Sequence, residues 1–258
     1  MQSDYKPIIF DIDPDMEDVE LHIVHDIHYG NAQHHAKQWN AFKDRVVRQR
    51  NAYVVFIGDM MENVIPSSKG DIFGQTASPQ EQKEWLTDQL LDLKDKTICV
   101  LDGNHERNRS TKAAGLYPLY DCCVIAGIKE RYRPHFAFVD IGVGRSAKNP
   151  NRQIRYIGYL VHKAKDMKNF STADTVDGID FMAYGHDHDP KDHTRAKLVY
   201  NSNSRTVSLK NVETINSGAF LVYGEYSVDN GYRPLSEKKY KLILHGGAKR
   251  IESVGYYL

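Results

Sequence analysis

The stretch Thr97-Ile98-Cys99-Val100-Leu101-Asp102-Gly103-Asn104-His105-Glu106 organises this chain of 258 residues. It begins with an apolar run that is typical of a strand. It ends in the sequence GNHE, which places an amide, an imidazole and a carboxylate just beyond that strand. Such side chains bind divalent metals, so similar groups after other strands would indicate a shared site.

Four further polar clusters also follow strand-like runs. Two of them contain a glycine, which lets the backbone turn tightly at a strand end. Each motif alone has a simpler interpretation, because Asp-x-His and Gly-Asp occur often by chance and a lone His is more often a core residue. Five such clusters in one chain are a stronger signal and predict a metal centre. The four clusters are Asp26-Ile27-His28, Gly58-Asp59, His162, and Gly185-His186-Asp187-His188.

The composition narrows the class of protein. Apolar residues make up 41% of the chain, charged residues 26%, and the formal net charge is zero. A neutral chain has no global field that attracts nucleic acid or anionic membrane, so binding a polyanion requires a local patch. No apolar run approaches the roughly 20 residues of a membrane span, and the N-terminus lacks a secretory signal. The three cysteines, Cys99, Cys122 and Cys123, favour a reducing compartment, so we expect a cytoplasmic protein.

Strands and helices alternate in the first half of the chain. This order predicts parallel strands with right-handed crossovers, which brings the clusters after those strands to one edge of a sheet. The second helix begins with a capping box, in which Ser78 caps, Pro79 occupies the first turn and Glu81 supplies the acid. Strands are expected over 19–25, 52–57 and 97–101, helices over 33–50 and from 78 to 94, and a loop over 61–77.

The second half changes character after a helix that we expect over 107–128. From Arg133 onward, strand-like runs separated by turn residues predict a second sheet with mainly antiparallel neighbours. The last two runs, 239–245 and 250–256, are expected to close a sheet edge. The simplest arrangement is a single domain over residues 1–258, with an α/β fold in which two sheets pack face to face and helices lie outside.

A pair of divalent ions needs a bridging carboxylate, and Asp59 directly after Gly58 suits that role. A water between two such ions ionises near neutral pH and becomes an in-line nucleophile for a phosphoryl group. His105 follows Asn104 and is expected to face the leaving oxygen, where it donates a proton or a hydrogen bond. Glu106 is the candidate to orient His105. Spacing by two would place Asp26 beside His28, and His186 beside His188, on one side of a strand end.

These motifs resemble those of the calcineurin-like metallophosphoesterase superfamily. Its pattern is DxH, GDxxD, GNHD or GNHE, a lone His, and GHxH, and all five blocks occur in this order over residues 26–188. The chain looks similar to the nuclease subunit of double-strand-break repair complexes without its DNA-capping domain, and to compact stand-alone members such as phage-encoded forms. The resemblance implies a four-layer α/β/β/α sandwich of two mixed sheets with helices on the outside, and a metal-dependent phosphoric ester hydrolase.

The resemblance also implies a ligand set for two divalent ions and a catalytic histidine, His105, that binds neither. Manganese is the ion we expect first, with iron, zinc and nickel as alternatives, because mixed Asp, Asn and His ligation suits all four. Glu62 stands where the family usually has Asp. His25 stands where a small hydroxyl residue is common, and we interpret it as structural because on a strand it would point away from Asp26. One ion would be held by Asp26, His28, Asp59 and His188, and the other by Asp59, Asn104, His162 and His186.

Basic and aromatic residues beside the clusters bear on the substrate. Cations at a helix start favour phosphate because the backbone amides there add to their charge, and aromatic rings near the site can stack a base. Ordinary solvated side chains are an equally good interpretation. The basic residues are Arg107, Arg109, Lys112, Lys163, Lys165 and Lys168, of which Arg107, Arg109 and Lys163 are the candidate substrate ligands; the aromatic residues are Tyr29 and Phe73.

We therefore expect a phosphodiesterase or nuclease that acts on nucleic acid or nucleotides, with no membrane partner and with a homodimer left open. The alternative is a phosphomonoesterase that acts on nucleotides or phosphoproteins. A third interpretation is an inactive scaffold that binds proteins. Such a scaffold should have lost metal ligands, whereas every ligand position is filled in this sequence.

Overall fold

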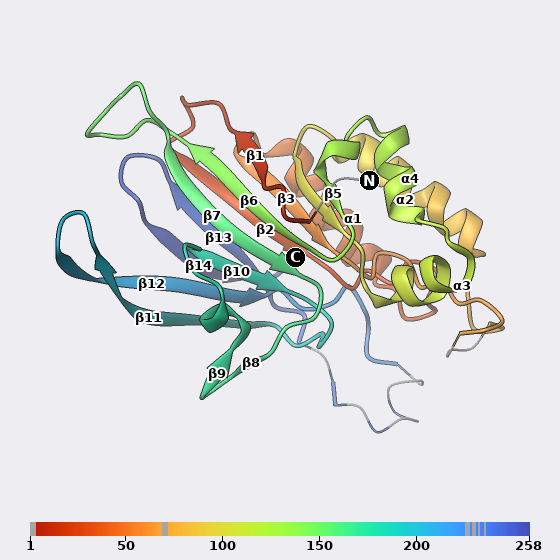
Figure 1. The fold of residues 1–258 in the computed structure, drawn as a ribbon. Helices are drawn as coiled ribbons and strands as arrows, with labels where there is room; N and C mark the ends of the chain where they lie inside the picture. Colours follow the sequence, from red (N-terminus) through yellow and green to blue (C-terminus); the bar gives the residue numbers. More distant parts are fainter. Residues whose placement is uncertain (1–3, 69–71, 225–227, 229–230, 232, 235) are drawn as a thin grey trace.

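Two six-stranded sheets pack face to face at the centre of the molecule (Figure 1). This computed structural model describes residues 4–68, 72–224, 228, 231, 233–234 and 236–258. Side chains from both sheets fill the space between them, with Val55 and Leu101 from one sheet and Val139 and Leu160 from the other. The predicted α/β fold of two mixed sheets and helices is confirmed.

The first sheet consists, in spatial order, of β14 (Ile251–Tyr256), β13 (Lys239–His245), β2 (Asp18–Val24), β3 (Ala52–Ile57), β4 (Thr97–Leu101) and β5 (Tyr132–Arg133). The strands from β2 to β5 are parallel, as the alternation with helices predicts. The last two strands of the chain, β13 and β14, pair antiparallel and close an edge, also as predicted.

Three helices cover the outer face of the first sheet, namely α1 (Ala36–Arg48), α2 (Pro79–Leu93) and α4 (Pro118–Ile125) (Figure 1). Helix α1 buries Trp39, Phe42 and Val46 as one stripe, and burial of such side chains contributes about 1.5–3 kcal/mol each. The predicted capping box of α2 is confirmed, because Ser78 and Glu81 each accept a hydrogen bond from the other's backbone N–H. This box fixes where the preceding loop ends.

The single helix expected over 107–128 is wrong. The segment forms a π-helix, η1 (Glu106–Thr111), a short α3 (Lys112–Ala114) and the separate α4. Gly115 ends α3 in the left-handed conformation with φ of 68°, and Pro118 starts α4 in its first turn. A short 3-10 helix, η2 (Lys129–Arg131), then leads into β5.

The second sheet consists, in spatial order, of β1 (Ile8–Asp11), β6 (Phe136–Val143), β7 (Ile154–Val161), β10 (Phe181–Tyr184), β12 (Thr206–Asn216) and β11 (Lys191–Asn201). The prediction of mainly antiparallel neighbours was wrong, because β1–β6, β7–β10 and β10–β12 are parallel pairs. Residues 162–180 connect β7 to β10 as a crossover, which makes the two strands parallel.

That crossover supplies the layer outside the second sheet. It contains a small hairpin, β8 (Asp166–Met167) with β9 (Phe170–Ser171), and a 3-10 helix, η3 (Thr172–Thr175). Ala173 and Ile179 of the crossover pack on Met182 and Tyr184 of β10. Within the described residues, none of the helices combines the length and the apolar character that crossing a bilayer requires.

Candidate metal centre

The five polar clusters meet where strands of both sheets end. The strands that lead into them are β2, β3, β4, β7 and β10, and each cluster begins within two residues of its strand. Backbone hydrogen bonds tie neighbouring clusters together, from Asp26 N–H to the Gly58 carbonyl and from Gly185 N–H to the His162 carbonyl. The parallel order of β2, β3 and β4 therefore brings three remote segments to one edge, as the sequence predicts.

Most of the candidate ligands sit in left-handed backbone. This conformation is uncommon outside glycine and costs about 1–3 kcal/mol, so it occurs where the surrounding structure demands it. The spacing argument gave the wrong reason for the pairing of Asp26 with His28, because β2 ends at Val24 and a tight turn, not strand alternation, brings them together. The residues and their φ angles are Asp26 (51°), His28 (47°), Asp59 (52°), His186 (76°) and His188 (56°).

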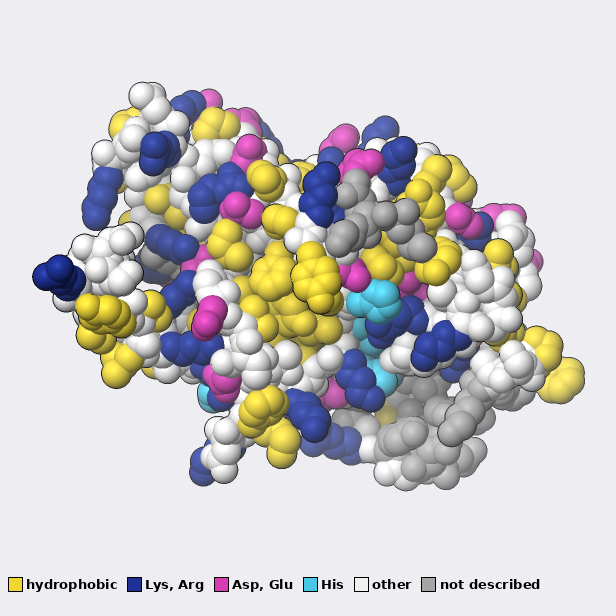
Figure 2. Space-filling view, viewed as in Figure 1, with side chains coloured by type: hydrophobic (Ala, Val, Ile, Leu, Met, Phe, Trp, Pro, Cys, Tyr) yellow, Lys and Arg dark blue, Asp and Glu magenta, His cyan; other side chains and the backbone are white. Residues whose placement is uncertain are grey.

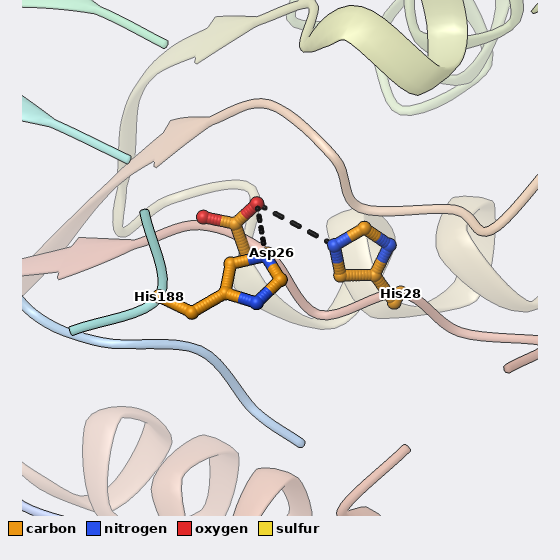
Figure 3. Close-up of side chains that lie close together, drawn as sticks. All are labelled: Asp26, His28 and His188. Carbon is orange, nitrogen blue, oxygen red and sulfur yellow. Dashed lines mark ion pairs between the residues drawn. The ribbon is translucent and has the colours of Figure 1, made fainter. Parts of the chain in front are cut away.

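A first group of three ligand atoms surrounds Asp26 (Figure 3). The Oδ1 atom of Asp26 lies 3.5 Å from Nε2 of His28 and 3.3 Å from Nε2 of His188. Oδ1 of Asp26 and Nε2 of His28 are buried and have no hydrogen-bond partner. Buried polar atoms are normally paired, so an unpartnered carboxylate oxygen and imidazole nitrogen, with Nε2 of His188 beside them, fit a cation.

A second group consists of Asp59, His162 and His186, with Asn104 beside it. His162 lies 2.8 Å through Nδ1 from the Ile57 carbonyl, so Nδ1 donates and the tautomer leaves a lone pair on Nε2. That Nε2 lies 3.0 Å from Oδ1 of Asn104 and 3.2 Å from Oδ2 of Asp59. A lone pair that faces two oxygens needs a proton or a metal ion between them, so this group also fits a cation.

Asp59 belongs to the second group and also lies in a third set of close ligand atoms, with His105 and with His28 of the first group. Two glycines make room for it. Its Oδ1 accepts a hydrogen bond of 2.8 Å from the backbone N–H of His105. A Cβ atom on Gly103 would lie 2.0 Å from Oδ1 of Asp59, and one on Gly58 would lie 2.3 Å from the Gly103 nitrogen. The GD and GN sequences therefore carry glycine because the β3 and β4 turns touch backbone to backbone.

Glu106 is fully buried and binds backbone rather than the ring of His105. Its carboxylate accepts hydrogen bonds from the N–H groups of Asp59, Met60, Met61 and Gly103, over distances of 2.8–3.1 Å. Burial, and next the nearby charge of Asp59, raise the pKa of Glu106. The side chain thus clamps the β3 turn to the β4 turn.

His105 lies beside the candidate ligands, and its Nδ1 atom contacts Glu62 and Arg109. Nδ1 is 2.9 Å from the Glu62 carbonyl and 2.9 Å from the guanidinium of Arg109, and Nε2 is 3.8 Å from Oδ2 of Asp59. Glu62 turns its carboxylate to His28, with Oε2 3.0 Å from Nδ1 of that ring. Glu62 therefore orients a candidate ligand.

The two carboxylates at the centre are ionised. Burial alone would raise the pKa of Asp26, but the charge of His188 and contacts with His25 and His28 outweigh it and hold that pKa well below the usual range. Burial likewise opposes ionisation of Asp59, and the charge of His162 outweighs it and lowers the pKa of Asp59. For His162, the nearby Asp59 overcomes burial and raises the pKa to about 9. The site is thus built for positive charge.

His25 and Lys239 support the site in ways that sequence reasoning missed. His25 does not point away from its neighbour; its Nδ1 lies 2.6 Å from Oδ2 of Asp26, and its Nε2 accepts a hydrogen bond from the Ser217 N–H. Lys239 is buried and donates to the carbonyls of Gly218 and Ala219. Adjacency to Asp26 was the one signal for His25, whereas a lysine within a strand gave none for Lys239.

The candidate substrate residues lie in unlike environments. Lys163 is exposed directly after His162. Arg107 is partly buried and donates to the Gly103 carbonyl. The side chain of Arg109 is 13% exposed and is engaged with Glu62.

The two aromatic residues expected near the site also differ. Tyr29 stacks on Trp85, with ring centroids 3.9 Å apart and planes within 3°. Phe73 is 99% exposed. The ring of Tyr29 therefore already has a partner within the protein.

Comparison with known proteins gives only distant likeness. No protein-family model matches the sequence, and no curated protein matches it. Among solved structures, Vps29 from Chaetomium thermophilum is similar with 10% identity and a TM-score of 0.40, over 93% of this chain and 98% of that one. Vacuolar protein sorting 29 from Cryptosporidium parvum is similar with 12% identity and a TM-score of 0.42, over 95% of this chain and all of that one. Functional conclusions must therefore come from the site itself.

Proposed function

We propose that the protein is a dinuclear-metal phosphoesterase that hydrolyses phosphodiester bonds in nucleic acid or nucleotides. The observation that carries this proposal is a pair of ligand groups, one around Asp26 and one around Asp59, of which the first contains a buried oxygen and a buried nitrogen atom without partners. Manganese is the first ion to test, followed by iron, zinc and nickel. The proposed ligands are Asp26, His28, Asp59 and His188 for one ion, and Asp59, Asn104, His162 and His186 for the other.

When bound, the two ions would neutralise phosphoryl charge and lower the pKa of a water to near neutrality. The protein's own part is to fix the ligands before substrate arrives. Glu62 and the Ile57 carbonyl each engage the Nδ1 of a histidine, which directs Nε2 into the site. Glu106 holds the β3 and β4 turns together, so we assign it a positioning role.

His105 is the proposed proton or hydrogen-bond donor to the leaving oxygen. Its Nε2 faces the site at 3.8 Å from Asp59, whereas its Nδ1 is held outside by Glu62 and Arg109. Burial, with the positive charge of His28, lowers the pKa of His105 to about 4. The guanidinium of Arg109 donates to the Glu62 carbonyl and also faces Nδ1 of His105, so we assign that nitrogen the lone pair and Nε2 the hydrogen. Such a neutral imidazole donates a hydrogen bond from Nε2 without repelling two cations.

The test is hydrolysis of bis-p-nitrophenyl phosphate and of single-stranded DNA by metal-free protein reloaded with manganese. We expect turnover of both, abolished by chelator and by His105→Ala. A mononucleotide screen runs in parallel, and activity confined to phosphomonoesters would replace the diesterase proposal with the monoesterase alternative. Protein that binds no ion under any loading condition would sink the proposal and favour the scaffold.

A further inference from the structure

Aromatic side chains gather on the outer face of the second sheet. Phe136 and Phe138 of β6 and Tyr159 of β7 form one cluster, with ring centroids 5.3–6.2 Å apart. Tyr5 joins it edge-on, 5.4 Å from Phe136. Figure 2 shows a patch of hydrophobic side chains on this side of the molecule, with histidine side chains next to it. We call these four residues the aromatic face.

The aromatic face begins at the rim of the metal centre. In the antiparallel β6–β7 pair, Phe136 stands opposite Val161, and the next residue after Val161 is the candidate ligand His162. Phe138 stands opposite Tyr159, one repeat further along the strands, which is a step of about 7 Å. The strand that carries Tyr159 therefore ends at the site.

This face is only partly covered, although it belongs to a central pair of strands. Phe136, Phe138 and Tyr159 are partly exposed and Tyr5 is 84% exposed. The 162–180 crossover packs on Met182 and Tyr184 of β10, and Phe138 and Tyr159 pack against the same cluster. This packing accounts for the covered part of the two rings, and their exposed parts leave an apolar surface of the kind that marks an interaction site.

Positive charge follows the candidate ligand His162 in the crossover. Lys163, Lys165 and Lys168 follow His162 and are all exposed. Asp166 lies among these lysines in the sequence. Its Oδ1 atom forms an ion pair with the guanidinium of Arg195 at 2.8 Å, which neutralises its negative charge. Aromatic rings that stack bases, flanked by cations that track phosphates, form the usual surface for single-stranded nucleic acid.

We propose that the aromatic face binds single-stranded nucleic acid and leads it to the metal centre, with bases stacked on Phe138 and Tyr159 and phosphates near Lys163. This inference rests on the proposed function, which it narrows from phosphodiesters in general to single strands. Because every base has a stacking face, binding tolerates any sequence. A duplex keeps its bases stacked within the helix and so binds less tightly.

Fluorescence anisotropy with a labelled oligothymidylate tests the inference. Chelator is present, so that nothing is cleaved and the measurement does not depend on catalysis. We expect Phe138→Leu and Tyr159→Leu each to weaken binding about tenfold, whereas Tyr159→Phe keeps the ring and the affinity. The matched control is Tyr200→Leu, at a 64% exposed tyrosine on β11 at the far edge of the same sheet, and it leaves binding unchanged.

The outcomes separate this inference from the proposed function. Unchanged affinity in both Leu variants overturns the inference, even if the wild type hydrolyses bis-p-nitrophenyl phosphate. So does equal affinity for a blunt duplex, or loss of self-association in the Leu variants without loss of oligonucleotide binding, which would make the face a protein contact. A wild type that fails on the small diester but shows the ring-dependent binding refutes the proposed function alone.

Discussion

The Oδ1 atom of Asp26 and the Nε2 atom of His28 face each other across 3.5 Å, and neither has a hydrogen-bond partner. Both residues hold left-handed backbone, and both have their other polar atom occupied, Asp26 Oδ2 by His25 and His28 Nδ1 by Glu62. The backbone is therefore strained at the two residues whose ligand atoms have no hydrogen-bond partner. Such an arrangement costs stability unless a cation completes it.

Asp59→Asn should weaken both metal ions at once, because we propose that Asp59 bridges them. Its carboxylate lies with His162 and His186 in one set of ligand atoms and with His28 of the first group in another. An amide of the same size keeps the shape of the turn but removes the charge. Metal content after gel filtration and two-site calorimetric titration would measure the loss. Asp187→Asn is the matched control, since this exposed aspartate stands between His186 and His188 and should leave both ions bound. Loss of a single ion from Asp59→Asn would contradict the bridging assignment.

His105→Ala should keep both metal ions and lower kcat by about 10²–10⁴-fold, since the group acts mainly in the transition state. Steady-state kinetics on bis-p-nitrophenyl phosphate, together with metal analysis, would check this. His193→Ala is the control, at an exposed histidine just beyond the GHDH turn. If His105→Ala lost metal in proportion to activity, His105 would be a ligand.

Gly103→Ala should destabilise the protein and impair metal binding. The added Cβ would lie 2.0 Å from Oδ1 of Asp59, and backbone on both sides prevents either turn from retreating. Forced overpacking of this kind costs about 1–3 kcal/mol, visible in chemical denaturation. Gly247→Ala is the control, because a Cβ there meets nothing within 4 Å. A Gly103→Ala protein with unchanged stability would mean that the turns can separate freely.

Lys239 should give the metal-free protein a characteristic pH dependence. Burial lowers its pKa to about 7 in the folded state, well under its unfolded value, so the unfolded chain binds more protons between pH 7 and 10. Stability should therefore rise with pH across that window, by about 1.4 kcal/mol per pH unit from this group. Denaturation in chelator at pH 7, 8 and 9 would measure the slope. Lys239→Met should flatten it, and an unchanged slope in that variant would assign it to another group.

The sequence by itself determined which candidate ligand residues the chain offers and much of the first sheet. Local patterns are enough to find the five clusters, the parallel strands that carry them and the Ser78 capping box. Hydrophobic periodicity and the signals that start or end a helix or strand are encoded within a few residues.

The tertiary structure decided the rest. It placed Glu106 on the backbone of the β3 turn, brought His25 onto Asp26, tied Arg109 to Glu62 and set Phe138 beside Tyr159. It also made β7, β10 and β12 parallel where local pattern favoured antiparallel neighbours. Each of these outcomes depends on which distant segments become neighbours and in what register they pair. A local sequence pattern specifies neither the neighbours nor the register.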